Sequence, residues 1–428
     1  MLAEGTHVQT SRWAGAVGLN LAFHSVWPLF VCVGILLVLA RSPLLAGADP
    51  PPSDRTPRVA TLDGLRGFLA LAVVFHHVGI YHNYMLAERW TFPPSRVYSL
   101  LGATGVSLFF MITGYLFWGR LLRTRGRPDW FSLYAGRLFR IGPLYLVAVG
   151  AMLLIVFCLT WPTLEVAPRQ LAAQLASWLS LGVDSREPDV NGYAQTFSLL
   201  AGVTWSLQFE WFFYASLPVL ALAARRGWHL AFAASGVPVC LVAAHFAPLD
   251  QHDWLVCVAL FASGMAAASM QAKRKGLGLP DAVASALVVL LIALAVSIPD
   301  HPYSVTSVVL LATAFHLIVS GSTLFGLLVS RAARRLGDIS YGIYLLQGLF
   351  LAAVFRPASL KEAALASPLA YWSLALAATV LLVLAACVAH TVVERPGIKL
   401  GRYVTEMLKR SAARGESEQL PVPGGARR

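Results

Sequence analysis

The stretch "LDGLRGFLALAVVFHHVG", residues 62–79, decides the fold because it sets two opposed signals side by side. It begins with a charged turn, then stays hydrophobic for about the length of a helix, and carries two adjacent histidines near its far end. Ionisable side chains within a membrane span are costly and usually face a protein interior or an aqueous cavity. The stretch therefore predicts a membrane helix with one polar, inward-facing side.

The composition of the whole chain indicates a membrane protein. Of the 428 residues, 57% are hydrophobic and 13% are charged, which is too few polar groups to cover the surface of a soluble globule. We expect an all-α fold, a polytopic bundle of about 11 transmembrane helices of roughly 20 residues each. The expected spans are residues 23–46, 65–81, 97–119, 138–160, 201–224, 228–247, 253–271, 281–298, 304–329, 338–356 and 369–393. Three of these, 65–81, 253–271 and 281–298, are short for a membrane span.

The net charge of +12 would suit a nucleic-acid partner, but its distribution argues against one. The segment 120–140 holds six arginines and one acid, whereas the following loop, 161–200, holds four acids and two arginines. Later loops continue to alternate in sign, as the positive-inside rule requires. We therefore expect a multi-pass protein of the cell (plasma or inner) membrane, with its N-terminus outside, its C-terminus in the cytoplasm and no nucleic-acid partner.

Three regions are expected along the chain. Residues 1–58 would form an N-terminal transmembrane helix and the Pro-rich linker "ADPPPSDRTPR", 59–400 the membrane domain, and 401–428 a cytoplasmic polar tail, disordered from 411 onward. The first apolar segment could instead be a cleaved secretory signal, but little positive charge precedes it, which favours a retained helix. The loop 161–200 is expected to carry an amphipathic segment near 169–181.

The five cysteines all lie within apolar spans and lack CxxC spacing, so we expect neither a disulfide framework nor a metal site. These residues are Cys32, Cys158, Cys240, Cys257 and Cys387.

Helical geometry places Arg66 and His77 on the same side of one helix. Eleven residues at 100° each amount to three turns plus roughly 20°, and the rise is about 16 Å. With Arg66 at the cytoplasmic boundary, His77 would lie near the bilayer centre, while His76 would point elsewhere. A histidine at this depth is either hydrogen-bonded to a neighbouring helix for structural reasons or part of a site.

A second ionisable group is expected at a similar depth. Glu210, in "WSLQFEWFFY", is the one carboxylate deep within an apolar span, and a buried carboxylate needs a partner. We expect Glu210 and His77 to orient each other as in a general-base pair. His316 and Gln347 also fall near the midplane, and His316 is interpreted as structural. The same polar groups would suit a transporter that uses them as a substrate or proton path.

Six ordered motifs give the chain a resemblance to the acyltransferase 3 family over about residues 60–400. They are "LDGLRGFLALAVVFHH", "GVSLFFMITGYLF", "RLFRIGPLYL", "WSLQFEWFFY", "LGDISYGIYLLQ" and "VVERP". Two positions depart from the family pattern: Thr113 stands where Ser is commoner, and Gln347 stands where the late motif often has His. The resemblance implies a ten-span core, to which the N-terminal helix is added here.

Members of that family are multi-pass membrane O-acyltransferases. They take acyl-CoA, most often acetyl-CoA, from the cytoplasm and acylate a hydroxyl of a polysaccharide, a lipid-linked sugar, peptidoglycan or a secreted small molecule. The resemblance implies that His77 is the general base and that Glu210 orients or polarises it. No metal is implied, and the partners are acyl-CoA, a carbohydrate or other hydroxyl-bearing acceptor, and the lipid bilayer.

The remaining candidate residues bind the two substrates. Arg137 and Arg140 are three residues apart on one helix face and suit the CoA phosphates, because guanidinium binds phosphate oxygens bidentately. Arg137 and Arg140 would also suit anchoring at the membrane boundary and contact with lipid headgroups. Arg66 would face the same cofactor entrance. The predicted substrate-binding residues are Asp63, Trp205, Ser206 and Gln347. Gln347 cannot act as a base, which keeps an inactive binding scaffold open as a further alternative.

Overall fold

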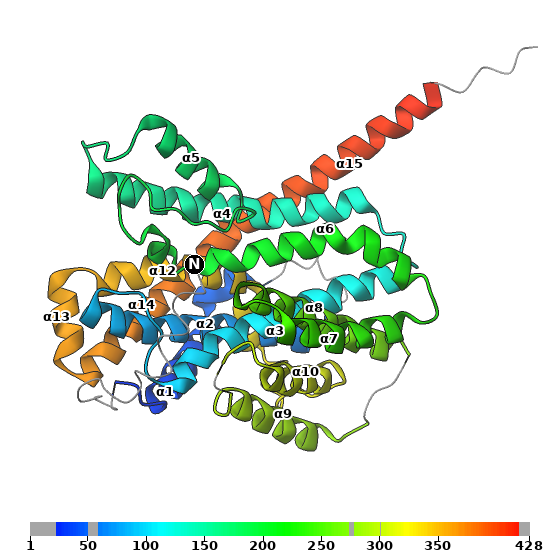
Figure 1. Ribbon diagram of the computed structural model, residues 1–428, viewed down its shortest axis with the longest axis horizontal. Coiled ribbons are helices and arrows are strands. Elements are labelled where there is room, and N and C mark those ends of the chain that lie inside the picture. Colours follow the sequence, from blue (N-terminus) through cyan, green and yellow to red (C-terminus); the bar gives the residue numbers. More distant parts are fainter. Residues whose placement is uncertain (1–22, 50–58, 274–277, 300, 419–428) are drawn as a thin grey trace, which may run out of the picture.

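The computed structural model of the 428-residue chain describes residues 23–49, 59–273, 278–299 and 301–418. Within these ranges the protein is built from helices, and its β-structure is limited to an isolated bridge between Val190 and Tyr193. The helices pack as a bundle around a buried hydrophobic core (Figure 1). The expected all-α membrane fold is confirmed.

Seven helices in the described residues are long and apolar enough to cross a membrane. They are α2 (Ala60–Ala87), α3 (Arg96–Arg123), α4 (Trp130–Thr160), α6 (Leu207–Ala224), α7 (His229–Phe246), α8 (Leu249–Ala272) and α14 (Pro368–Ala389). An eighth span is formed if α11 (Arg331–Asp338) and α12 (Ser340–Phe355) are taken together across their 68° bend.

The expected number of about 11 spans is not confirmed. Three apolar helices, α1 (Trp27–Arg41), α9 (Asp281–Ala295) and α10 (Val305–Val319), have 15 residues each. Such a helix is about 22 Å long, shorter than a hydrocarbon core of roughly 30 Å. Conversely, the expected short spans 65–81 and 253–271 lie in α2 and α8, which are 28 and 24 residues long. Hydropathy misses the polar first turns of α2, which line a cavity.

Shorter helices complete the chain. They are η1 (Pro43–Ala48), α5 (Pro168–Leu179), η3 (Thr196–Leu200), η4 (Val203–Ser206), α13 (Ala358–Ala366), η5 (His390–Glu394) and α15 (Arg395–Glu418). The amphipathic segment expected near 169–181 is α5. The expectation of disorder from residue 411 is wrong as far as Glu418, because α15 reaches that residue. Residues 50–58, most of the expected Pro-rich linker, and 419–428 lie outside the described ranges.

The sequence Gly397–Gly401 explains why the tail forms a packed helix. A Cβ on Gly397 would lie 2.8 Å from the carbonyl oxygen of Phe139, and one on Gly401 would lie 2.7 Å from the Cβ of Phe139. Two glycines four residues apart let helix backbones approach closely, as in membrane helix pairs. α15 is thereby fixed against α4 before it extends away from the other helices (Figure 1).

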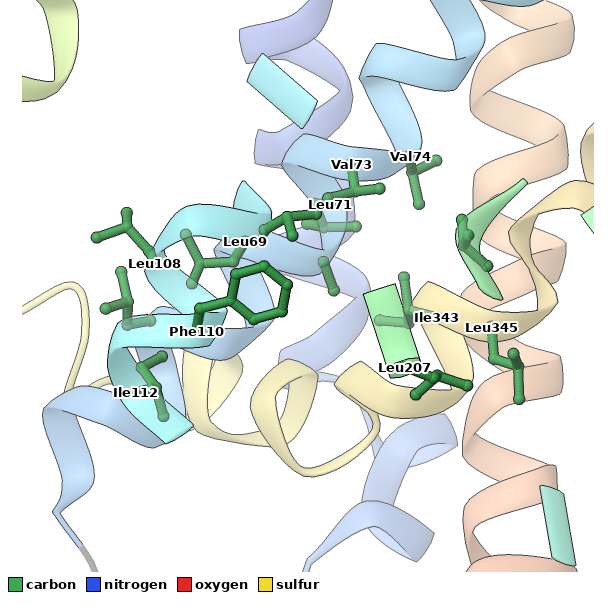
Figure 2. Close-up of a cluster of buried hydrophobic side chains, with 14 of the residues drawn as sticks. Leu69, Leu71, Val73, Val74, Leu108, Phe110, Ile112, Leu207, Ile343 and Leu345 are labelled. Atoms are coloured by element: carbon green, nitrogen blue, oxygen red, sulfur yellow. The ribbon is translucent and has the colours of Figure 1, made fainter. Parts of the chain in front are cut away.

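Glycines of two family-like motifs also serve packing. A Cβ on Gly64 would lie 1.9 Å from the carbonyl oxygen of Leu328, and one on Gly337 would lie 1.7 Å from that of Asp63. The backbones of α2 and α11 therefore touch, and no side chain fits between them. Figure 2 shows the adjoining buried cluster, which draws Leu69 from α2 and Phe110 from α3 together with residues of α6 and α12.

The N-terminal helix is held by a buried arginine of α11. Arg335 donates to both carboxylate oxygens of Asp49, at 2.6 and 2.7 Å, and to the carbonyls of Ala40 and Ser42. Arg331 donates to the same carboxylate at 2.9 Å. These guanidiniums hold the pKa of Asp49 well below its usual range. Bidentate charge-assisted bonds of this kind fix the end of α1 and η1 to the bundle.

Candidate active site

A wide cavity lies where α2 begins, α3 ends and α15 leaves the bundle, and we call it the basic cavity. Its volume is about 1340 Å³. Six cationic side chains line it against two acidic ones, Asp63 and Asp338. The cationic residues are Arg66, Arg123, Arg140, Arg395, Lys399 and Arg402. A lining of this charge attracts a polyanion.

A narrower cavity of about 180 Å³, the inner cavity, adjoins the basic cavity. The two share Arg66, Leu116 and Arg140 as lining residues. The polar residues that line only the inner cavity are Thr113, Arg137, Ser206, Glu210, Tyr214, Ser340, Tyr341 and Tyr344. Two of the three predicted cofactor arginines therefore stand at the junction of the cavities, and Arg137 stands beyond it.

Glu210 lies among these arginines and not beside the predicted base. Its carboxylate accepts a hydrogen bond of 2.6 Å from the hydroxyl of Tyr214, one turn along α6. Arg137 places its guanidinium 5.0 Å from the ring centre of Phe117, within the range of a cation–π contact. Among the described residues no hydrogen bond joins Glu210 to His77, so the expected mutual orientation of these two side chains is wrong.

His77 instead pairs with Gln347. The Nδ1 atom of His77 lies 2.9 Å from the carbonyl oxygen of Val73 and 3.1 Å from Oε1 of Gln347. The amide of Gln347 is oriented by its NH₂ group, which donates to the carbonyl of Tyr344 at 2.7 Å. Both atoms that face Nδ1 are therefore acceptors, which requires the proton to sit on Nδ1. The Nε2 atom then carries the lone pair that a general base needs.

His76 is buried beside His77 but has different partners. Its Nδ1 lies 2.7 Å from the carbonyl oxygen of Tyr98, at the start of α3. The two imidazole rings meet edge to face, with centres 4.9 Å apart, and the ring of Trp90 stacks on His77 at 6.1 Å. The expectation that His76 points elsewhere is confirmed.

The segment of η3 and η4 enters the bundle beside α12. A Cβ on Gly348 would lie 2.3 Å from the backbone nitrogen of Ala201, so the backbones of α12 and of the η3–η4 segment touch next to Gln347. One turn earlier on α12, the hydroxyl of Tyr344 meets that of Ser206 at 2.8 Å and donates to the carbonyl of Val203 at 3.1 Å. These contacts link the end of the inner cavity to the His77–Gln347 pair.

A carboxylate of the 161–206 segment also packs against η4. Glu187 accepts a hydrogen bond from the hydroxyl of Thr204. Burial raises the pKa of Glu187 to about 7, against the opposing effect of that hydrogen bond. Nearby, Arg356 donates to the hydroxyls of Tyr193 and Ser198 at 2.6 and 2.5 Å. The segment is thus a packed part of the protein and not a loose loop.

Comparison with known proteins agrees with this architecture. The acyltransferase domain model matches residues 59–389, which run from the start of α2 to the end of α14. The chain belongs to the acyltransferase 3 family. Acyltransferase MdmB of Streptomyces mycarofaciens is 27% identical over 384 residues, which cover 81% of this chain and 93% of that relative. No solved structure shows a significant match.

This membership makes the chain an acyltransferase, so the transporter interpretation is set aside. Of the predicted substrate-binding residues, Ser206 lines the inner cavity and Gln347 contacts His77. Asp63 lines the basic cavity together with Arg66. Trp205 lines neither cavity and instead packs its ring 5.6 Å from that of Phe209. The catalytic and binding roles of all these residues stay predictions.

Several residues of the candidate site were not expected from the sequence. Tyr344, in the motif "YGIY", carries the contact between α12 and η4, and its only signal was the motif itself. Three cations of α15 line the basic cavity beyond the last matched residue. Their spacing, Arg395, Lys399 and Arg402, follows one helix face and was available from the sequence. From the sequence alone, these cations are interpreted only as part of the positive charge expected in cytoplasmic segments.

Proposed function

We propose that this acyltransferase moves an acyl group, above all acetyl, from cytoplasmic acyl-CoA to a hydroxyl of a glycan or other extracytoplasmic or secreted acceptor. The observation that supports it is the basic cavity, with six cationic and two acidic lining residues, joined through Arg66 and Arg140 to a narrow inner cavity. The phosphates of CoA need the wide cationic part, and its thin pantetheine arm needs the narrow one.

The length of the donor supports the same placement. About twelve bonds separate the pantetheine phosphate oxygen from the thioester sulfur, a span of roughly 15 Å when extended. Arg66 and His77 are separated by about 16 Å along α2. Phosphates held at Arg66 and Arg140 therefore bring the thioester close to the level of His77. Glu210 and Tyr214 lie along the path of the arm, where the carboxylate can accept an amide N–H of pantetheine.

The proposed reaction uses His77 as general base. Nε2 takes the proton of the acceptor hydroxyl while its oxygen attacks the thioester carbonyl. The tetrahedral intermediate then collapses, the carbon–sulfur bond breaks, and the imidazolium returns the proton to the CoA thiolate. Gln347 holds the imidazole with its proton on Nδ1 and thus has a positioning role in place of the histidine common in the family. The products are an ester and free CoA.

The orientation of the chain follows the charge distribution. Arg123 and Arg140 lie at the end of the bundle that holds the basic cavity, and the positive-inside rule assigns that end to the cytoplasm, where acyl-CoA is found. The opposite end, with the 161–206 segment, would then face outward. An acceptor reaching His77 from that side would meet Trp90 and the neighbouring rings of Tyr81 and Tyr84, which suit the apolar face of a sugar.

The test is acyl transfer by the full-length protein in lipid vesicles. Labelled acetyl-CoA is supplied together with glycans and secreted metabolites from a strain lacking this gene, whose acceptors are unmodified. We expect label in a hydroxylamine-sensitive ester, with one CoA thiol released per ester formed. The matching product should be missing from the deletion strain and present in its parent. Label in an amide, or no release of CoA with any fraction, would contradict the proposal.

A further inference from the structure

The cationic face of α15 lies outside the part of the chain that the family model matches. The match ends at residue 389, whereas Arg395, Lys399 and Arg402 all line the basic cavity. At 100° per residue these three positions fall within about 60° of one another, so they form one side of the helix. Over seven residues they extend about 10 Å along the axis, which exceeds the size of a single phosphate.

The opposite side of α15 is fixed to the bundle. Gly397 and Gly401 pack against Phe139 on α4, and they lie roughly 200–240° around the helix from Arg395. Arg395 itself donates to the backbone carbonyls of Ala48 and Asp49 at 2.9 and 2.5 Å. The helix is therefore held at both its sides near the cavity, which keeps the cationic face directed at it. Lys399 and Arg402 are exposed side chains on this face.

We infer that Lys399 and Arg402 form a subsite for the 3′-phosphate of the CoA ribose, an inference that rests on the proposed function. The donor arm places the pyrophosphate at Arg66 and Arg140, where the inner cavity begins. The adenosine end must then extend toward the wide part of the basic cavity. Its phosphomonoester carries close to two negative charges at neutral pH, and two cations on a fixed helix face provide the matching charge.

The basic cavity then holds two groups of cations with different roles. Arg66 and Arg140 contact the part that every CoA derivative has, so they bind any such molecule. Lys399 and Arg402 contact a phosphate that 3′-dephospho-CoA lacks, so they provide selectivity for CoA itself. A charge-assisted phosphate contact corresponds to roughly 10- to 100-fold in affinity.

The experiment measures binding, which needs no acceptor. Isothermal titration calorimetry of the purified full-length protein in detergent compares CoA with 3′-dephospho-CoA. We expect the parent to bind CoA at least about 10-fold more tightly than the dephospho compound. Lys399→Ala should lose most of this preference by weakening CoA binding alone, and Lys399→Arg should keep it. Arg140→Ala should weaken binding of both compounds alike.

Arg410→Ala is the matched control, because Arg410 is an exposed cation on the same helix that lines neither cavity. It lies about 16 Å beyond Lys399 along the axis and should leave both affinities unchanged. Equal affinity of the parent for the two compounds, or an unchanged preference in Lys399→Ala, would overturn the inference and leave the proposed function intact. Binding of neither compound by the parent would overturn the proposed function itself.

Discussion

The two ends of the proposed reaction path differ in almost every physical respect. The basic cavity has a volume of about 1340 Å³ and is lined by arginine and lysine side chains. Two of these, Lys399 and Arg402, lie on the exposed face of α15. The His77 region is closed: His77 is 7% exposed, Gln347 is fully buried, and the ring of Trp90 stacks on His77. The wide part suits a hydrated polyanion, and the narrow part suits a few atoms held in one geometry. Binding and chemistry should therefore separate when each end is altered.

The largest separation is expected at His77. Replacing it with Ala removes a proton-transfer contribution of roughly 100- to 10,000-fold in rate. CoA binding should stay within about twofold of the parent, because the cationic lining of the basic cavity is unchanged. The measurement is steady-state acyl transfer in vesicles, with calorimetric CoA affinity of the same preparation. Equal losses of transfer rate and CoA affinity in His77→Ala would mean that the His77 region also contributes to CoA binding.

His76 provides the control for that variant. His76 is the preceding residue, its side chain is also 7% exposed, and its Nδ1 is likewise hydrogen-bonded to a backbone carbonyl. His76→Ala should lower stability by about 2 kcal/mol or more, because it removes a buried hydrogen bond and empties the space of a packed ring, and it should leave the rate near that of the parent. An inactive His76→Ala beside an active His77→Ala would reverse the assignment of the base.

A smaller effect is expected at Gln347. Gln347→Ala removes one of two acceptors of the Nδ1 proton and keeps the carbonyl of Val73, so the imidazole is less firmly oriented but still paired. We expect a loss of roughly 10-fold in kcat with unchanged CoA affinity. Gln347→His should restore most of it, because a neutral ring nitrogen also accepts. Complete loss of transfer in folded Gln347→Ala would show a role in proton transfer.

The sequence predicted on which side of a helix a side chain lies better than it predicted which side chain of another helix it contacts. Periodicity correctly separated His76 from His77, whose imidazoles have different hydrogen-bond partners. It paired His77 with Glu210 by depth alone, whereas the structure pairs it with Gln347, 270 residues away. Depth fixes one coordinate of a side chain, and which neighbour stands opposite depends on helix packing. That packing is set by contacts such as Gly64 with Leu328, which have no periodic signal.

The fold shows the same limit. Composition and apolar segments were enough for an all-helical membrane protein, and each expected span overlaps a helix. Hydropathy did not indicate that α9 and α10 would end after 15 residues or that α11 and α12 would bend by 68°. The cations of α15 followed one face in the sequence, but only their packing on α4 shows that a cavity lies beside that face.

The smallest effect concerns Glu187 in the 161–206 segment, which contributes no residue to the lining of the basic cavity. Burial raises the pKa of Glu187 to about 7, so the folded protein holds a proton there that the unfolded chain releases near pH 4.5. The contribution of this proton to the free energy of unfolding is complete below about pH 4.5 and is lost as the pH rises through 7. The free energy of unfolding falls by at most about 1.4 kcal/mol per pH unit in this range. Because Glu187 is only half-buried, the observed slope should be smaller.

Glu187→Gln stays neutral and should flatten this dependence of stability on pH. Glu165→Gln changes an exposed glutamate of the same segment and should leave the dependence unchanged. Thermal unfolding midpoints in detergent at pH 5, 6, 7 and 8 measure this slope. Identical pH profiles for the parent and Glu187→Gln would mean that this carboxylate is hydrated and that the segment packs less tightly on η4 than its contact with Thr204 indicates.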